Sequence, residues 1–233
     1  MIEDLIKDLQ KEKNLGQAKL LQGFFKTGKD EYGEGDVFIG LKVPVTRSIA
    51  KKYSGLNIKG IEMLLKSKVH EYRLTGLLIL VEKFKVADEK TRGDIFNFYL
   101  KNTKCVNNWD LVDLTSHKIV GEFLKDKSRE ILYTLAQSKN LWEKRISIIS
   151  CFAYIKDEDF KDALRISEML LKDEHDLIHK AVGWVLREIG KKDQEELEKF
   201  LKKHYKEMPR TMLRYSIERF DEKLRKAYLE GKI

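Results

Sequence analysis

The sequence predicts an all-α fold, and three observations support this prediction. Apolar residues recur at the 3.6-residue spacing of helices along almost the whole chain, whereas the alternation of a half-buried strand is hardly seen. Glycine and proline number only 14 and 2 among 233 residues, too few for many short strands joined by tight turns. Charged residues make up 36% of the chain and lie between the apolar clusters, as on the outer faces of packed helices.

Individual helices follow from apolar stripes and capping residues. Representative stripes, in chain order, are Leu5, Ile6 and Leu9; Leu74, Leu77, Leu78 and Val81; and Ile178, Ala181, Val182, Val185, Leu186 and Ile189. Helix starts are expected at Asp88, Asp193 and Asp221, and Glu196 forms a capping box with Asp193. We expect helices of about 10 to 16 residues. The breaks at 54–55, 126–128 and 172–174 are short, so neighbouring helices should pack antiparallel.

Helix pairs recur about every 35 to 45 residues, which is the period of HEAT-like repeats, and no linker divides the chain. We therefore expect one domain over residues 1–233. The segment Thr27–Asp36 differs, because it has three glycines and no apolar stripe, and it is expected to be a surface loop. Its glycines match neither a Walker A loop nor the dinucleotide-binding fingerprint, so a nucleotide site is not expected.

Charge and targeting features limit the classes of function. The chain has 46 Lys and Arg against 38 Asp and Glu, and the net charge of +8 favours an anionic partner. The uncharged stretch at 146–155 has ten residues, whereas a membrane span needs about 20. The N-terminus lacks the pattern of a signal peptide, so we expect a cytoplasmic protein. Cys105 and Cys151 are too few for a disulfide framework or a zinc cluster.

An arginine interrupts the apolar stripe of the helix expected over residues 141–155. Arg145 projects from the middle of the stripe that contains Leu141, Ile148 and Phe152. A guanidinium in such a place needs an anion, because burying an unpaired charge is costly. The anion is either an internal carboxylate in a structural ion pair, or a phosphate or carboxylate of a ligand.

The helix expected from residue 176 to about 190 carries a tryptophan on its basic face. Trp184 lies opposite the apolar stripe. The basic residues of that face are Lys180, Arg187 and Lys191. Gly183 costs a helix about 1 kcal/mol relative to Ala, which indicates that another group approaches the backbone closely there. In the alternative interpretation the whole face packs on a neighbouring helix, with its Lys and Arg side chains reaching water.

The segment Asn107–Asp113 combines an aromatic residue and a carboxylate. Trp109 and Asp113 are four residues apart, so on a helix they project side by side. An indole face next to a carboxylate suits a cation, either an electron-poor substrate or a cationic transition state. In the structural alternative, Trp109 is a core residue and Asp113 is a helix cap or an arginine partner.

The histidines are less specific. His175 and His179 have the spacing of two zinc ligands, but the Glu of an HExxH motif and a third ligand are missing, so no metal site is expected. His70 and His117 are isolated and are interpreted as structural histidines.

Four segments together resemble a known family. They are NNWDLVD at 107–113, LWEKRISI at 141–148, HKAVGWVLREIGK at 179–191 and, more loosely, GLKVPVTR at 40–47. In these segments the chain resembles the AlkD family of DNA alkylation repair glycosylases. The resemblance implies a right-handed solenoid of HEAT-like antiparallel helix pairs with a basic concave face. It also implies a catalytic carboxylate at Asp113, groove tryptophans at Trp109 and Trp184, and a phosphate-binding arginine at Arg145. Some members have a second aromatic residue before Trp109, where this chain has Asn108.

The implied reaction is excision of positively charged N3- or N7-alkylated purines from duplex DNA by hydrolysis of the N-glycosidic bond. The base leaves as a neutral molecule, so no general acid, metal or organic cofactor is expected. Asp113 would stabilise an oxocarbenium-like transition state and orient water. Expected contacts to the DNA backbone are Arg145, Lys180, Arg187, Lys191, Arg47, Lys51, Arg210 and Arg214. For Arg210 and Arg214 a solvated face is an equally good explanation. The protein is expected to act as a monomer.

Two other functions compete with this one. A non-catalytic helical-repeat module would bind DNA structures or a protein partner through the same surface, and a scaffold for acidic proteins would bind without sensitivity to competing DNA. Net charge does not separate these functions. The combination of Trp109, Asp113 and Trp184 favours the enzyme, because a surface that only binds phosphates does not need it.

Overall fold

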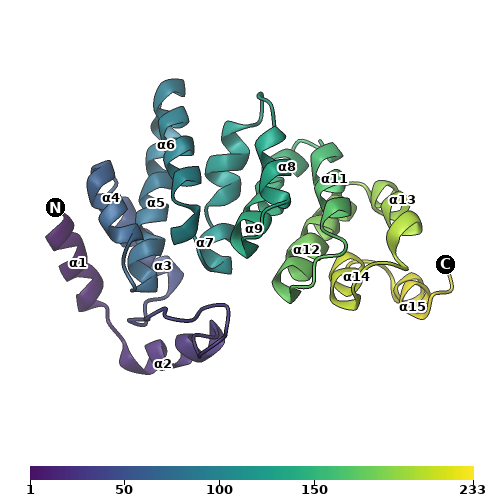
Figure 1. Ribbon diagram of the computed structural model, residues 1–233, viewed down its shortest axis with the longest axis horizontal. Helices are drawn as coiled ribbons and strands as arrows, with labels where there is room; N and C mark the ends of the chain where they lie inside the picture. Colours follow the sequence, from purple (N-terminus) through teal and green to yellow (C-terminus); the bar gives the residue numbers. More distant parts are fainter. The chain divides into compact units, whose positions relative to one another are not determined.

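The computed structural model describes all residues 1–233 and consists of helices and connecting loops without a strand (Figure 1). The one extended pairing is an isolated parallel bridge between Val37 and Val69. The expected all-α fold is therefore confirmed. By its internal contacts the chain divides into two compact units, Met1–Thr115 and Ser116–Ile233. A single domain over residues 1–233 stays a prediction.

The first unit is organised around helix α5. Its helices are α1 (Ile2–Lys11), α2 (Leu15–Phe24), α3 (Val43–Lys52), α4 (Ile58–Leu65), α5 (His70–Val86), α6 (Glu89–Lys101) and α7 (Trp109–Asp113), with a 3₁₀ turn, η1, at Thr103–Cys105. Helices α3, α4 and α6 pack on α5. Every residue of α5 from Leu74 to Val81 is buried, because neighbours cover it on all sides.

The second unit is organised around helix α12. It contains a π-helical turn, η2 (His117–Gly121), followed by α8 (Glu130–Ala136), α9 (Leu141–Ser150), α10 (Phe152–Ile155), α11 (Lys161–Met169), α12 (Asp176–Lys192), α13 (Gln194–His204), α14 (Arg210–Ser216) and α15 (Glu222–Glu230). Helices α9, α11, α13 and α14 all contact α12 (Figure 1). The apolar stripe expected along α12 is buried at every position, so that prediction is confirmed.

The three helix starts expected at aspartates are confirmed. The side chains of Asp88, Asp193 and Asp221 each accept a hydrogen bond from a backbone N–H three residues later, at 2.8 to 3.0 Å. Helix lengths vary more than expected, from 4 residues in α10 to 17 in α5 and α12. None of the helices is both long enough and apolar enough to cross a membrane.

The single helix expected over residues 141–155 is a wrong prediction, because the chain breaks between α9 and α10 at Cys151. There the backbone N–H of Cys151 bonds to the carbonyl of Ile148, three residues back, as in a 3₁₀ turn. Gly121 of η2 packs closely on this break, since a Cβ at Gly121 would lie 2.3 Å from the carbonyl oxygen of Ser150. A contact between segments distant in sequence thus accompanies the break, and local periodicity does not reveal it.

Candidate functional site

Helix α7 carries the tryptophan and the carboxylate that stand out in the sequence. It begins after Asn108, whose side-chain oxygen accepts a hydrogen bond from the backbone N–H of Trp109 at 2.9 Å. Leu111 and Val112 are fully buried and anchor the helix. Trp109 and Asp113 are partly exposed and, at four residues apart, share one face. The segment is helical, so Trp109 and Asp113 have the side-by-side placement described for a helix, and Asp113 stands on a short, well-anchored element.

The indole of Trp109 is supported on one side. It stacks on Phe25, with ring centroids 4.9 Å apart and planes 5° apart, and meets Phe24 edge-on at 5.9 Å. Phe25 is buried against Phe38, whereas Phe24 is 65% exposed. Trp109 is therefore packed on the core, as the structural alternative supposes, while its side chain stays partly exposed.

Asp113 ends α7 beside a buried phenol. The hydroxyl of Tyr99 is hydrogen-bonded to Thr115 at 3.0 Å. Burial raises the pKa of Tyr99, the bond to Thr115 lowers it, and the negative charge of Asp113 raises it. The net effect is a higher pKa, so Tyr99 stays neutral at physiological pH and Asp113 provides the acidic side chain of this face.

A buried ionic network ties the start of α7 to two other segments. His70, the first residue of α5, has Nδ1 3.2 Å from Asp36 and Nε2 2.9 Å from Asp110. Arg73 donates to the second oxygen of Asp36 at 2.7 Å, and Asn108 donates to Asp36 at 3.3 Å. Each of these side chains belongs to a residue that is at most 5% exposed. The loop before Asp36, α5 and α7 are thus joined away from water.

Opposing effects set the charges of this network. Burial lowers the pKa of His70, but the charge and hydrogen bond of Asp110 and the hydrogen bond to Asp36 outweigh burial and raise it to about 9. Burial raises the pKa of Asp36, but the hydrogen bond with His70 and the charges of Arg73 and His70 outweigh burial and lower it. At neutral pH, His70 is therefore an imidazolium and Asp36 a carboxylate.

The glycine-rich segment Thr27–Asp36 is a loop, as expected, and its last residue enters the network. Gly33 packs so closely that a Cβ there would lie 2.4 Å from the carbonyl oxygen of Phe25. Just beyond the loop, the buried carboxylate of Glu71 accepts hydrogen bonds from the backbone N–H groups of residues 39–41 at 2.8 to 3.2 Å. These contacts hold the loop against α5.

In the second unit, the partly exposed Trp184 of α12 belongs to a row of three aromatic rings. Phe152 of α10 lies 4.7 Å from Trp184 and 6.4 Å from the ring of His117 in η2, measured between centroids. A Cβ at Gly183 would lie 2.5 Å from the Cβ of Tyr215 on α14. The close approach expected at Gly183 is therefore confirmed, and the approaching group is α14.

Arg145 is buried in α9, with 4% of the residue exposed. It donates a hydrogen bond from one terminal nitrogen to the carbonyl oxygen of Leu177, in the first turn of α12. A guanidinium has five N–H donors in a planar fork, so it can bind more than one acceptor at once. The contact of Arg145 with a ligand phosphate stays a prediction.

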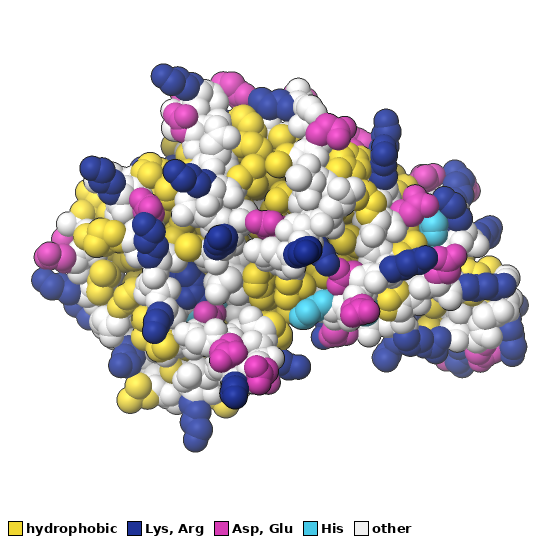
Figure 2. Space-filling model, in the orientation of Figure 1, with side chains coloured by type: hydrophobic (Ala, Val, Ile, Leu, Met, Phe, Trp, Pro, Cys, Tyr) yellow, Lys and Arg dark blue, Asp and Glu magenta, His cyan; other side chains and the backbone are white.

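The other side chains expected to contact the DNA backbone form two groups. Three are paired with carboxylates of their own unit: Lys180 with Asp176 at 2.7 Å, Lys191 with Glu188 at 2.8 Å, and Arg187 with Glu218. Arg47, Lys51 and Arg214 are exposed without a carboxylate partner, and the exposed Arg210 donates to the carbonyl of Leu229. Figure 2 shows lysine and arginine side chains spread over the face that it draws, with acidic side chains among them. The contact of either group with DNA phosphates stays a prediction.

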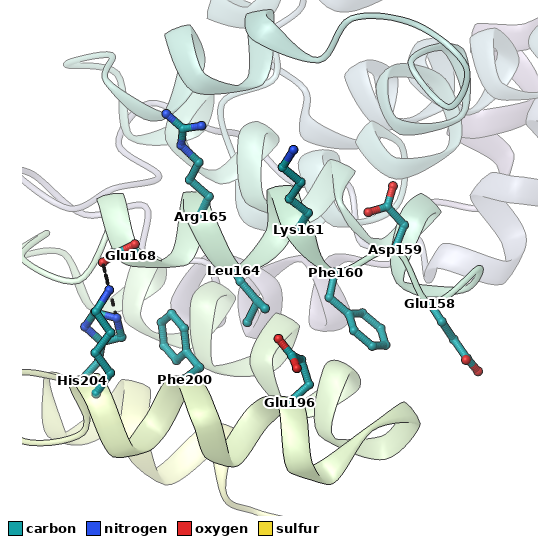
Figure 3. A pocket seen from close by; sticks show the side chains of 11 residues that line it. Glu158, Asp159, Phe160, Lys161, Leu164, Arg165, Glu168, Glu196, Phe200 and His204 are labelled. Atoms are coloured by element: carbon teal, nitrogen blue, oxygen red, sulfur yellow. Dashed lines mark hydrogen bonds and ion pairs between the residues drawn. The ribbon is translucent and has the colours of Figure 1, made fainter.

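Two cavities in the second unit differ in their relation to these residues. One of about 630 Å³ lies between α11 and α13 (Figure 3), and its Glu168 is paired with Lys203 at 2.8 Å and with His204 at 3.5 Å. No expected site residue lines it. Another, of about 600 Å³, includes Lys180 and Arg214 in its wall.

The histidine pair on α12 serves the start of that helix. Nδ1 of His175 accepts a hydrogen bond from the N–H of Leu177 at 3.1 Å, and Nε2 of His179 is bonded to the carbonyl of Asp173 at 2.5 Å. No group of three or more His, Cys, Asp or Glu side chains is placed to hold a metal ion.

The network around His70 was not predicted from the sequence. His70 looks like an isolated structural histidine there, because its partners Asp36 and Asp110 lie 34 and 40 residues away in the chain. A signal was present in His70, Glu71 and Arg73, which begin a helix that continues as an apolar run. Charged side chains entering a core need partners, so this pattern indicates charged residues elsewhere in the chain that pair with them.

Comparisons with known proteins give a family from one match and a similar fold from two others. A family model described as DNA alkylation repair enzyme matches residues 5–220. A predicted DNA alkylation repair enzyme from Enterococcus faecalis has a similar structure, with a TM-score of 0.69 and 16% identity over 91% of this chain and 98% of that one. AlkD2 from Streptococcus mutans aligns with a TM-score of 0.56 and 18% identity over 88% and 97%. At such identities these structures show the fold alone. A search of curated proteins found no match.

Proposed function

The chain belongs to the DNA alkylation repair enzyme family, and we propose that it is a DNA glycosylase that removes positively charged N3- or N7-alkylated purines from duplex DNA. Alkylation of these ring nitrogens makes the base cationic, so cleavage of the glycosidic bond releases a neutral molecule. The leaving group needs no acid, and the proposal includes no metal or organic cofactor. The reaction does need a group that stabilises the positive charge developing on the deoxyribose.

The observation that carries the proposal is the shared face of Trp109 and Asp113 on α7. Asp113 would stabilise the oxocarbenium-like sugar and orient the water that attacks it. The partly exposed indole of Trp109 would attract the cationic nucleotide. Because Phe25 supports the other face, the indole is held in one orientation before the substrate arrives.

Two residues of the second unit are also assigned contacts with the DNA. Trp184, with Phe152 behind it, offers another aromatic face to a cationic nucleotide. Arg145, which donates to the carbonyl of Leu177, would hold a phosphate through its planar guanidinium. Both roles are parts of this proposal.

Affinity for the DNA backbone is assigned to the basic side chains of both units. Arg47, Lys51 and Arg214 are exposed and ready to contact phosphates. The paired or hydrogen-bonded group consists of Lys180, Arg187, Lys191 and Arg210. Such contacts carry no sequence information and weaken as salt increases. In this proposal the protein acts as a monomer in the cytoplasm.

The proposal is tested by comparing the release of a cationic and a neutral lesion base. Duplexes of one sequence carry either N7-methylguanine, which is cationic, or hypoxanthine, which is neutral, and release of the free base is measured. We expect release of N7-methylguanine and little release of hypoxanthine, because the site supplies no acid for a neutral base. No release of either, by a folded protein that binds the duplex, would refute the glycosylase and favour the non-catalytic DNA-binding module.

A further inference from the structure

His70 is a buried histidine with a carboxylate at each ring nitrogen, Asp36 at Nδ1 and Asp110 at Nε2. Ionised carboxylates only accept hydrogen bonds, so both contacts are hydrogen bonds only when both ring nitrogens carry a proton. The ring also stacks on Phe38, with centroids 4.5 Å and planes 21° apart, and lies 5.1 Å from Phe25. The surroundings therefore fit the imidazolium and not the neutral ring.

The charges that face His70 come from every segment around it. The loop contributes Asp36, α7 contributes Asp110, and α5 contributes Arg73 through Asp36. Glu71, the next residue of α5, is satisfied separately by the backbone N–H groups of residues 39–41. When His70 is protonated, the carboxylates of Asp36 and Asp110 are balanced by two cations, His70 and Arg73. A neutral ring would leave one buried negative charge in excess and one carboxylate without its hydrogen bond.

The contact between His70 and Asp110 acts on the helix that carries the proposed reactive face. Asp110 is the second residue of α7, and its other oxygen accepts a hydrogen bond from the N–H of Leu111 at 2.8 Å. Trp109 stacks on Phe25, which also touches the ring of His70. Loss of the bridge would therefore release the start of α7 and disturb the support of Trp109 together.

We propose that protonated His70 is a positioning residue for base excision: by bridging Asp36 and Asp110 it holds α7, and with it Trp109 and Asp113, in the reactive arrangement. The inference rests on the proposed function. A misplacement of about 1 Å can slow a reaction by about 100-fold, so loss of the bridge lowers kcat. Affinity for DNA changes less, because it comes mainly from contacts to the backbone. The pKa of His70, raised to about 9, places the loss of activity on the alkaline side.

The test is the pH dependence of base release under single-turnover conditions with saturating protein. Release of N7-methylguanine is followed from pH 6.5 to 10, and release without protein is subtracted at each pH. The wild-type rate should fall as the pH rises through about 9. Asp110→Asn puts a neutral amide in place of an anion that helps His70 to keep its proton. The fall in rate should therefore begin about one pH unit lower or more. His204→Gln, which removes a buried histidine of the second unit, should leave the wild-type profile unchanged.

Asp36→Asn removes the other anion and provides the same test if Asp110→Asn folds poorly. A network with a merely structural role would lower the rate by the same factor at every pH and leave the alkaline fall unmoved, and this result would overturn the inference. Nitrogen-15 NMR at pH 7.5 tests the bridge without activity, since both ring nitrogens of His70 should carry protons. One unprotonated ring nitrogen would also overturn the inference. If the wild type releases no base at any pH, the proposed function fails and the positioning role fails with it, while the NMR result still decides the bridge.

Discussion

Titration of His70 should control how the stability of the first unit depends on pH, and His70→Gln should remove that dependence. Folding raises the pKa of His70 from 6.5 to about 9, so the folded state favours the protonated ring. A group with a raised pKa contributes its full stabilisation below its unfolded pKa and loses it as the pH rises through its folded pKa. The free energy of unfolding should therefore decrease between pH 6.5 and about 9.

The size of the decrease follows from the two pKa values. The difference between 9 and 6.5 corresponds to about 3 kcal/mol when the ring is protonated in both states. Linkage places about 2 kcal/mol of the loss between pH 6.5 and 8.5. Tyr99 does not interfere, because burial raises its pKa above the ordinary 10.0 and it weakens folding only when the unfolded phenol ionises.

The assay is urea unfolding at pH 6.5 and 8.5, followed by tryptophan fluorescence. Trp142 and Trp184 are replaced by Phe in every protein compared, so that Trp109 alone reports on the first unit. The reference protein should lose about 2 kcal/mol between the two pH values, and the His70→Gln protein less than about 0.5 kcal/mol. His204→Gln should keep the full loss. Equal losses with and without His70 would show that its titration does not control this pH dependence.

Three further predictions follow from particular contacts. Gly183→Ala should lower the free energy of unfolding by about 1 to 3 kcal/mol, because the new Cβ would lie 2.6 Å from the carbonyl oxygen of Met212 on α14; an unchanged thermal midpoint would contradict this. Arg145→Ala should weaken DNA binding and turnover and reduce the slope of log affinity against log salt by about 1; an unchanged slope would argue against a phosphate contact. Arg214→Ala should weaken binding to alkylated and unmodified duplexes by the same factor, measured by fluorescence anisotropy, and a loss confined to the alkylated duplex would be inconsistent with a backbone contact.

Local features of the fold were predictable from the sequence because they depend on neighbours along the chain. The stripe of α12 and the cap at Asp193 repeat or act within a few residues, so spacing alone reveals them. Gly183 was informative for a related reason, since a glycine inside a long helix is unfavourable unless another element lies close. The approaching helix, α14, was not predictable, because no local pattern specifies which elements meet.

The site was predictable in part. Trp109 and Asp113 share a helix face whatever the rest of the chain does. That Phe25 covers one side of Trp109, and that His70 joins Asp36 to Asp110, depend on contacts across tens of residues. A lone histidine has no periodic pattern that points to such partners. These supporting contacts are nevertheless what fixes the orientation of α7.

The most direct test of the account is the single-turnover rate of N7-methylguanine release by the wild type and by Asp113→Asn. The substitution keeps the size of the side chain and removes its charge, so it should leave duplex affinity nearly unchanged. We expect release to slow by about 100-fold or more, because one preorganised group that stabilises developing charge contributes at least that much. Asp94→Asn, the same change at an exposed carboxylate of α6, should keep the wild-type rate. Release by Asp113→Asn at the wild-type rate would contradict the catalytic role of Asp113.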